Sequence, residues 1–151
     1  MTVSMVIDSP VGHIELCASK THLLSVSFVD KPLKSAKHSA ILRAAEQQLS
    51  EYFSGDRTQF HLPIGQTGTE FQQKVWQALQ DIPYGETISY KTLAQRIGNP
   101  KAVRAVGGAN NKNRLAIVVP CHRVIGQNGK LVGYASGVDT KQKLLSLEGI
   151  L

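Results

Sequence analysis

The chain has 151 residues, 42% of them hydrophobic and 19% charged, and its formal net charge is +6. This length suffices for one ordinary domain or two small lobes, and a composition without low-complexity runs or internal repeats excludes disordered and fibrous proteins. No stretch has the length and apolar character of a membrane span, and the first residues lack the basic and apolar regions of a signal peptide. Two cysteines are too few for a disulfide framework, so we expect a cytoplasmic protein with no signal peptide and no membrane partner.

The N-terminal part of the chain predicts a small α/β lobe. Residues 3–7, 12–18 and 23–29 are short β-rich runs separated by turn residues, which favours an antiparallel meander. Residues 35–54 have the apolar spacing of a helix, and residues 57–62 favour one more strand. No motif of recognised chemistry lies in this lobe.

The pattern changes near residues 63–68, and we place the boundary there, between lobes 1–66 and 67–151. Thr67-Gly68-Thr69-Glu70 is typical of a capping box at the start of a helix. The residues expected on the buried face of that helix are Phe71, Val75, Ala78 and Leu79.

Two short helices are expected next. Ser89 would cap the first, which Gly98 ends, and Asn99-Pro100 would begin the second, residues 101–110. Two short helices joined by a glycine-containing turn predict a helix-turn-helix. The expected fold class is α+β: a small N-terminal α/β lobe, with an antiparallel meander plus a helix, followed by a mainly helical C-terminal domain with a helix-turn-helix, winged-helix-like DNA-binding element.

The excess positive charge lies in the second half of the chain. Through Gln66 there are six basic and six acidic residues, whereas from Thr67 onward eleven basic residues face five acidic ones. Between Glu86 and Asp139 the chain has no acidic residue, and the basic residues of that span are Lys91, Arg96, Lys101, Arg104, Lys112, Arg114, Arg123 and Lys130. This span favours binding to a polyanion, and the alternative is a solvated basic face.

The second helix of the pair, residues 101–110, has small residues on much of its outer face. A helix that reads the major groove presents several Asn, Gln or Arg side chains to base edges, and here only Arg104 is long enough. We therefore expect close, largely sequence-independent docking in the minor groove. The alternative is a helix pair that serves packing alone.

Cys121 is the candidate nucleophile. Residues 115–119 are a continuous apolar run that predicts a buried extended segment leading to Pro120-Cys121-His122-Arg123. An ordinary thiol with a pKa of about 8.5 is mostly protonated near neutrality, so it needs a neighbouring base or positive charge, which His122 and Arg123 would supply. The alternative is an inert, half-buried thiol.

Two sets of residues are candidates for a zinc site: Cys121 with His122, and Cys17 with His13 and His22. Neither has the paired spacing of a metal site. A strand histidine beside a small buried thiol explains the second set more simply. We expect no metal.

Four motifs, in this order, resemble the O6-alkylguanine-DNA alkyltransferase family, also called methylated-DNA–protein-cysteine methyltransferases. They are Ile88-Ser89-Tyr90, Arg104-Ala105-Val106-Gly107-Gly108-Ala109, Pro120-Cys121-His122-Arg123-Val124-Ile125-Gly126 and Leu144-Leu145-Ser146-Leu147-Glu148-Gly149. The resemblance runs from about Gly68 to Gly149, and the N-terminal lobe is compatible with the variable α/β domain of that family.

The resemblance implies DNA repair by direct, irreversible transfer of the alkyl group of O6-alkylguanine in duplex DNA to a cysteine, once per molecule. O4-alkylthymine is a further candidate substrate. The resemblance implies no cofactor. No oxyanion hole is required, because the attacked carbon is saturated. The implied partner is damaged double-stranded DNA, bound by a monomer, with clustering of copies along DNA as a further possibility.

The family's catalytic roles transfer to four positions. Cys121 matches the alkyl acceptor, and His122 matches the base that takes its proton through a water molecule. Glu148 matches the carboxylate that orients this histidine, which is the logic of a catalytic triad. Asn113 matches the asparagine that braces the turn of the site.

The resemblance also implies how DNA is bound. Arg104 matches the arginine that fills the gap left by a nucleotide rotated out of the helix. Tyr90 matches the tyrosine that crowds the target phosphate and contacts the flipped guanine. Lys101, Ala102 and Ala105 are expected to contact DNA from the same helix as Arg104.

Three positions complete the expected substrate pocket. Val124 and Ser136 match residues that contact the guanine edge through backbone groups. Ala135 stands where some members carry tyrosine, which predicts a more open pocket and tolerance of larger alkyl groups.

Three other interpretations compete with repair. A binding-only relative would lack the acceptor, and Cys121 argues against it. A sequence-specific, redox-sensing regulator would need a recognition helix richer in long polar side chains. A cysteine hydrolase would need an oxyanion donor set, of which the sequence has no sign.

Overall fold

The structure is a computed structural model, and it describes residues 2–30, 39–131, 134 and 137–151. The chain divides into two compact units, Met1–Gln66 and Thr67–Leu151. Among the described residues, no helix has the length and apolar character that crossing a membrane requires.

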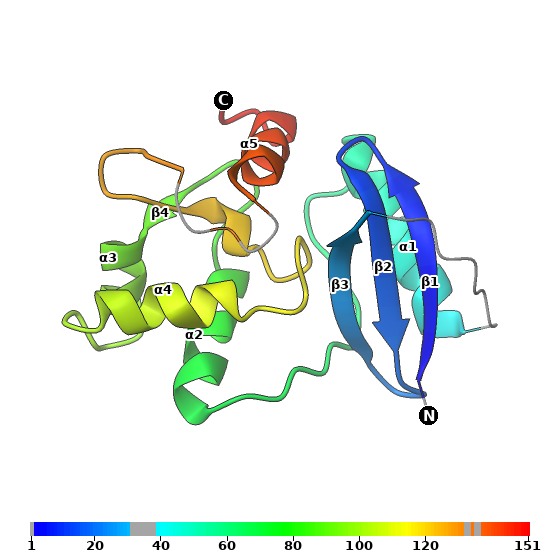
Figure 1. Cartoon of the computed structure of the whole chain (residues 1–151), viewed down its shortest axis with the longest axis horizontal. Helices are drawn as coiled ribbons and strands as arrows, with labels where there is room; N and C mark the ends of the chain where they lie inside the picture. The colour runs from blue at the N-terminus through cyan, green and yellow to red at the C-terminus, as the bar shows by residue number, and fades with distance from the viewer. Residues whose placement is uncertain (1, 31–38, 132–133, 135–136) are drawn as a thin grey trace. The chain divides into compact units, whose positions relative to one another are not determined.

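The N-terminal unit is a three-stranded antiparallel sheet with one helix (Figure 1). Strands β1 (Val3–Ser9), β2 (Gly12–Ala18) and β3 (Leu23–Val29) pair in chain order. Helix α1 (Ala40–Phe53) packs against all three strands through a buried face. Alternate residues of β2 are buried, as expected of a sheet covered on one face. The predicted meander and helix are confirmed.

Helix α1 begins later than the sequence predicts. The hydroxyl of Ser39 accepts a hydrogen bond from the backbone N–H of Leu42 at 3.2 Å, so Ser39 is the N-cap. Part of the predicted start, residues 35–38, lies outside the described residues.

Residues 57–62 do not form the predicted strand. The side chain of Gln48 in α1 hydrogen-bonds both the backbone N–H and the backbone carbonyl of His61, at 2.9 and 3.1 Å. These are the groups that a strand would use for pairing, so they are no longer available to a sheet. Pairing with β3 is limited to a single parallel bridge between Leu23 and Ile64.

The C-terminal unit is mainly helical, and helices α2 and α3 both pack against α4 (Figure 1). A two-stranded parallel pair and a 3-10 helix complete it. The elements are α2 (Glu70–Gln80), β4 (Ile88–Ser89), α3 (Tyr90–Arg96), α4 (Val103–Asn111), η1 (Cys121–Arg123), β5 (Val124–Ile125) and α5 (Val138–Leu147). The expected α+β fold class is confirmed.

The capping box of α2 lies two residues later than the sequence predicts. Thr69 accepts from the N–H of Gln72 at 3.1 Å, and the side chain of Gln72 accepts from the N–H of Thr69 at 3.0 Å. On the expected buried face, Val75 and Leu79 are fully buried, whereas Phe71 and Ala78 are half-buried.

Helices α3 and α4 form the predicted helix-turn-helix. Ser89 caps α3, since its hydroxyl accepts from the N–H of Thr92 at 3.0 Å. Gly98 follows α3 with φ of 79°, a left-handed conformation that favours glycine. Asn99 does not cap α4: its carbonyl accepts from the N–H of Ala102 in a separate turn, and α4 begins at Val103.

Candidate functional site

The segment before Cys121 is buried, but the predicted extended conformation is wrong. Leu115, Ile117 and Val119 have at most 1% of their surface exposed. The segment nevertheless folds into turns, with Val119 N–H donating to the carbonyl of Leu115 at 2.8 Å. Ile117 has φ of 71°, which is rare for a β-branched residue. Cys121 is therefore presented by a compact turn rather than by a strand.

Asn113 holds this turn together. Its side-chain amide donates to the carbonyls of Val119 and Leu115, at 2.8 and 3.5 Å, and its side-chain oxygen accepts from the N–H of Leu115 at 3.1 Å. One side chain thus bonds the backbone near both ends of the turn. This geometry suits the bracing function that the resemblance implies.

Cys121 and His122 are both buried in η1. Cys121 is 6% exposed and His122 is 0% exposed. The N–H of Cys121 donates to the carbonyl of Val119 at 2.8 Å, so the acceptor residue is fixed directly to the turn that precedes it.

Glu148, which follows α5, collects four hydrogen bonds in the core. The Nε2–H of His122 donates to Oε2 at 2.6 Å, and Arg123 donates to Oε1 and Oε2 at 2.9 and 3.1 Å. The N–H of Gly85 donates to Oε1 at 3.2 Å. Arg123 also donates to the carbonyl of Ile82 at 2.7 Å. The sequence interpretation missed this use of Arg123, which neutralises Glu148 instead of lying beside the thiol.

These contacts define the protonation state of His122. A carboxylate accepts hydrogen bonds only, so the neutral imidazole carries its hydrogen on Nε2 and leaves Nδ1 with a lone pair. Nδ1 is buried and has no hydrogen-bond partner among the residues that the structure describes. Burial lowers the pKa of His122 below its ordinary value, while the hydrogen bond and charge of Glu148 raise it. The resting imidazole is therefore neutral.

The Cys121 thiol is protonated at rest. Burial raises its pKa above the ordinary value, and the hydrogen bond of Asn113 and the positive charge of Lys141 oppose this rise. Burial also raises the pKa of nearby Tyr134 well above its ordinary value, and its buried hydroxyl has no hydrogen-bond partner among the described residues. A nucleophilic function therefore requires removal of a proton during the reaction rather than a preformed thiolate.

Lys141 is a buried cation that the sequence interpretation missed. It is 0% exposed, its Nζ donates to the carbonyl of Val124 at 2.5 Å, and Nζ lies 5.7 Å from the centre of the Tyr90 ring. Burial lowers its pKa to about 8, and the charge of Cys121 opposes this shift. Its position was detectable, because Lys141 stands three and four residues before the buried Leu144 and Leu145, on the apolar face of a helix.

Lys141→Met should shift the reaction of Cys121 with iodoacetamide to higher pH, because removal of a nearby positive charge raises the thiol pKa further. The rate would be measured against pH by intact mass in a Cys17→Ser background. The wild-type midpoint should lie above about 8.5, the value of an ordinary thiol. Lys143→Met, which changes an exposed lysine of the same helix, is the matched control. Superimposable profiles for Lys141→Met and Lys143→Met would contradict this electrostatic coupling.

The expected DNA-contacting side chains lie mostly on the surface. Arg104, Lys101 and Ala105 are exposed, and Ala102 is half-buried. The opposite face of α4 is buried. Of the basic residues in the acid-free span, Arg123 is buried in the core and the others are exposed. Arg123 therefore does not contribute to the basic surface.

Tyr90 and Val124 lie near the acceptor. Tyr90 is half-buried, and burial raises the pKa of its hydroxyl, as does the charge of Cys121. The N–H of Val124 donates to the carbonyl of Cys121. The other two expected pocket residues, Ala135 and Ser136, lie outside the described residues.

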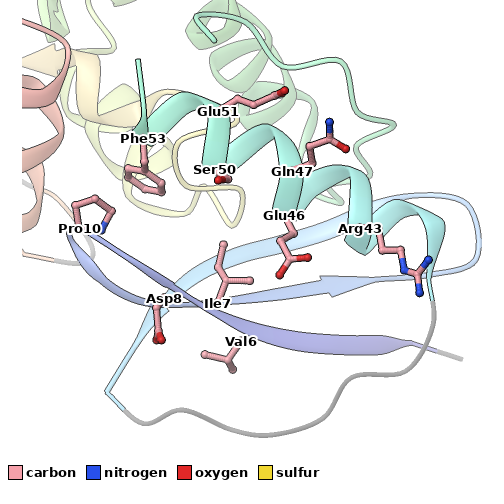
Figure 2. Close-up of a pocket in the computed structure, with 10 residues that line it drawn as sticks. All are labelled: Val6, Ile7, Asp8, Pro10, Arg43, Glu46, Gln47, Ser50, Glu51 and Phe53. Atoms are coloured by element: carbon pink, nitrogen blue, oxygen red, sulfur yellow. The ribbon is translucent and has the colours of Figure 1, made fainter. Parts of the chain in front are cut away.

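A groove lies in the N-terminal unit, between β1 and α1 (Figure 2). Its polar groups are already engaged in part, since Asp8 pairs with His13 and Glu51 pairs with Arg57. It contains none of the expected site residues. The lining residues are Val6, Ile7, Asp8, Pro10, Arg43, Glu46, Gln47, Ser50, Glu51 and Phe53.

Two family models match the chain in succession. Residues 3–66 match the ribonuclease-like domain of 6-O-methylguanine DNA methyltransferase, and residues 70–150 match its DNA binding domain.

Whole-length relatives carry the same description. The chain is 49% identical over 150 residues to a methylated-DNA–protein-cysteine methyltransferase of Methanosarcina acetivorans, covering 95% of this chain and 96% of the relative. It is 58% identical over 115 residues to the constitutive methylated-DNA–protein-cysteine methyltransferase of Bacillus subtilis, covering 76% and 70%.

Solved structures agree with these similarities. The crystal structure of Mycobacterium tuberculosis O6-methylguanine methyltransferase superposes with a TM-score of 0.89 at 43% identity, covering 98% of this chain and 93% of that one. A crystal structure of Mycobacterium tuberculosis OGT in complex with DNA gives a TM-score of 0.88 at 44% identity, covering 96% and 91%.

Proposed function

Since the chain belongs to the 6-O-methylguanine DNA methyltransferase family, we propose that Cys121 is the cysteine to which it transfers the alkyl group of damaged DNA. The chain is a methyltransferase of direct DNA repair, and DNA is its partner. Its other cysteine, Cys17, lies in the N-terminal sheet, where its strand neighbours are Ser4 and Ser25. Cys121 instead adjoins a histidine held by a buried carboxylate.

The observation that carries the proposal is the hydrogen bond between His122 and Glu148. It fixes the imidazole with Nε2 as the donor and leaves Nδ1 as a base in the same short helix as the thiol. Because Arg123 neutralises part of the charge of Glu148, His122 stays neutral and can accept a proton. General-base assistance of this kind contributes about 10²–10⁴-fold to rate.

The reaction balances without a further reactant. Sγ of Cys121 attacks the alkyl carbon on guanine O6, a sulfur–carbon bond forms, and the carbon–oxygen bond breaks with its electron pair remaining on the guanine. The thiol proton passes through a water molecule to Nδ1 of His122, and Glu148 stabilises the resulting imidazolium. The imidazolium of His122 then gives up this proton, which neutralises the departing guanine anion. The thioether has no leaving group under mild conditions, so each molecule acts once.

The helix-turn-helix would dock in the minor groove. The exposed face of α4 carries Arg104 and Ala105, and the exposed Lys101 lies just before the helix, a combination that suits close approach and phosphate contact more than base reading. We propose that Arg104 fills the space that the flipped nucleotide leaves in the DNA helix. The Tyr90 hydroxyl would contact the extruded base. Binding should then weaken steeply with salt and vary little with sequence.

We also propose that the two parts of the chain have different functions. Residues 67–151 bind DNA and carry the acceptor, and residues 1–66 form the accessory lobe. Both cysteines are free thiols, which suits a reducing cytoplasm as the compartment.

The direct test is to incubate the protein with a duplex that contains O6-methylguanine and to measure its intact mass. The protein should gain one methyl group, and peptide mapping should place it on Cys121. An undamaged duplex of the same sequence should leave the mass unchanged. No mass gain, or a methyl group on Cys17, would overturn the proposal.

Arg104→Ala should slow repair of duplex DNA by roughly tenfold or more, because the few kcal/mol that unstacking costs are no longer offset. Reaction with free O6-benzylguanine, which needs no flipping, should be nearly unchanged. Both rates follow from the appearance of alkylated protein in single-turnover experiments. Lys112→Ala, which changes an exposed basic residue just after α4, controls for charge. Equal losses with duplex and free base would contradict a flipping function.

A further inference from the structure

The turn at residues 83–86 follows helix α2, and the catalytic scheme assigns it no function. The N–H of Glu86 donates to the carbonyl of Pro83 at 3.1 Å, which closes the turn. Gly85, its third residue, has φ of 81°. A positive φ at this place is typical of a type II turn, and it favours glycine. The turn therefore has a defined conformation that fixes the directions of its side chains and backbone groups.

The residues of this turn and the one before it contact both members of the buried ion pair. The carbonyl of Ile82 accepts a hydrogen bond from Arg123 at 2.7 Å. The N–H of Gly85 donates to Oε1 of Glu148 at 3.2 Å. Between these two backbone contacts, the guanidinium carbon of Arg123 lies over the Tyr84 ring, 5.7 Å from its centre. One short segment thus holds the cation from two sides and the carboxylate from a third.

Tyr84 is the side chain through which the turn contacts Arg123. A cation over an aromatic face, within about 6 Å of its centre, is attracted by the ring quadrupole. The hydroxyl of Tyr84 donates to the carbonyl of Leu147 at 3.4 Å, at the end of α5 and directly before Glu148. The side chain of Arg123 is only 6% exposed. The half-buried ring therefore covers one face of the guanidinium, whose edge is bonded to Glu148.

The position of Arg123 decides how much of the charge of Glu148 acts on His122. The hydrogen bond and charge of Glu148 raise the pKa of His122, whereas burial and the charges of Arg123 and Lys141 lower it. Without the ring, water would reach the guanidinium and screen its attraction to the carboxylate. A less neutralised Glu148 would then favour the imidazolium, and His122 would be protonated up to a higher pH.

We propose that Tyr84 is a positioning residue of the transfer reaction, whose ring holds the Arg123 guanidinium against Glu148 and thereby preserves His122 as a base. This inference rests on the proposed function of Cys121 and His122. Tyr84 acts through the ion pair and not on the reacting atoms. The ring is the effective group, since it is the ring that faces the guanidinium.

The test compares Tyr84→Leu, which removes the ring, with Tyr84→Phe, which keeps the ring and loses the hydroxyl. Single-turnover rates would be measured against pH at a saturating concentration of O6-methylguanine duplex, so that changes in affinity do not contribute. Tyr84→Leu should move the midpoint of the acid limb up by about half a pH unit, roughly a threefold loss of rate below that midpoint. Tyr84→Phe should keep the wild-type midpoint. Phe71→Leu, which removes a half-buried ring from α2, is the matched control.

The outcomes are separable from those of the proposed function. If the wild-type protein takes up no methyl group, the proposed function itself fails, and a titration of the His122 imidazole by NMR still measures the effect of Tyr84→Leu on this base. If the wild-type protein is active, an unshifted midpoint for Tyr84→Leu overturns the positioning function, even where the rate falls equally at every pH. The same shift in Tyr84→Phe would also overturn it, because the ring would then not be the effective group.

Thermal melts would identify a folding defect in Tyr84→Leu. In that case Tyr84→Met, which is also unbranched at Cβ and has no ring, takes its place in the same measurements. If both variants are unfolded, Tyr84 is a residue of the fold rather than of the reaction, and the inference is overturned.

Discussion

Cys121→Ser is expected to abolish alkyl transfer while leaving the affinity for duplex DNA within about twofold of wild type. A serine hydroxyl is a far weaker nucleophile than a thiol, and neutral His122 is too weak a base to ionise it appreciably. Loss of a nucleophile commonly costs at least about a thousandfold in rate. Intact mass after incubation with O6-methylguanine duplex would measure the transfer, and a binding titration would measure the affinity.

Two further variants serve as controls for this substitution. Cys17→Ser should behave as wild type, because Cys17 lies in the N-terminal sheet. A buried serine hydroxyl is harder to accommodate than a thiol, so Cys121→Ala serves as a second variant that adds no polar group. A methyl adduct on either Cys121 variant would mean that another side chain is the acceptor.

Much of the N-terminal fold was predictable because its determinants are local. Strands β1 to β3 are short β-rich runs with turn residues between them, and their bounds agree closely with the prediction. The false strand at residues 57–62 has a non-local cause. The side chain of Gln48, more than ten positions earlier in the chain, hydrogen-bonds the backbone N–H and carbonyl of His61 in this segment. No pattern within the segment indicates that contact.

The turn before Cys121 shows a second limit. An apolar run of five residues fits a buried strand and a buried turn equally well, because burial alone sets its composition. The conformation depends on Asn113, which binds backbone groups at both ends of the run, and on the left-handed backbone of Ile117. The asparagine was visible in the sequence, but its hydrogen bonds were not.

The candidate site was predictable to the extent that its motifs occur in order. Cys121 and Glu148 are far apart in the chain, and only the resemblance linked them through His122. The partners of Arg123 were not predictable from the sequence, since basic residues usually face solvent. The burial of Lys141 was indicated only by its spacing from Leu144 and Leu145 on the apolar face of a helix. Both cations are buried because carboxylate or carbonyl acceptors from other elements meet them in the core.

The buried ion pair with Arg123 makes Glu148 a position at which substitution should affect both stability and catalysis. The side chains of Glu148 and Arg123 are 0% and 6% exposed. Breaking a buried pair by removing one partner leaves an uncompensated charge and typically costs about 3–5 kcal/mol. The loss of Glu148 also removes the acceptor of the His122 Nε2–H, so the imidazole is no longer held in the tautomer that leaves Nδ1 basic.

Glu148→Ala is therefore expected to lower the free energy of unfolding by about 3–5 kcal/mol and to slow alkyl transfer by about 10²-fold or more. Urea denaturation would measure the first effect, and single-turnover mass the second, at a temperature where the variant is folded. Glu86→Ala, an exposed acid of the same unit, should change stability by less than about 0.5 kcal/mol.

The double variant Arg123→Met/Glu148→Leu separates the two functions of the carboxylate. It removes both charges, so it should regain part of the stability but none of the transfer rate, because His122 still lacks its acceptor. Recovery of transfer in that double variant would show that Glu148 acts only through the stability of the fold.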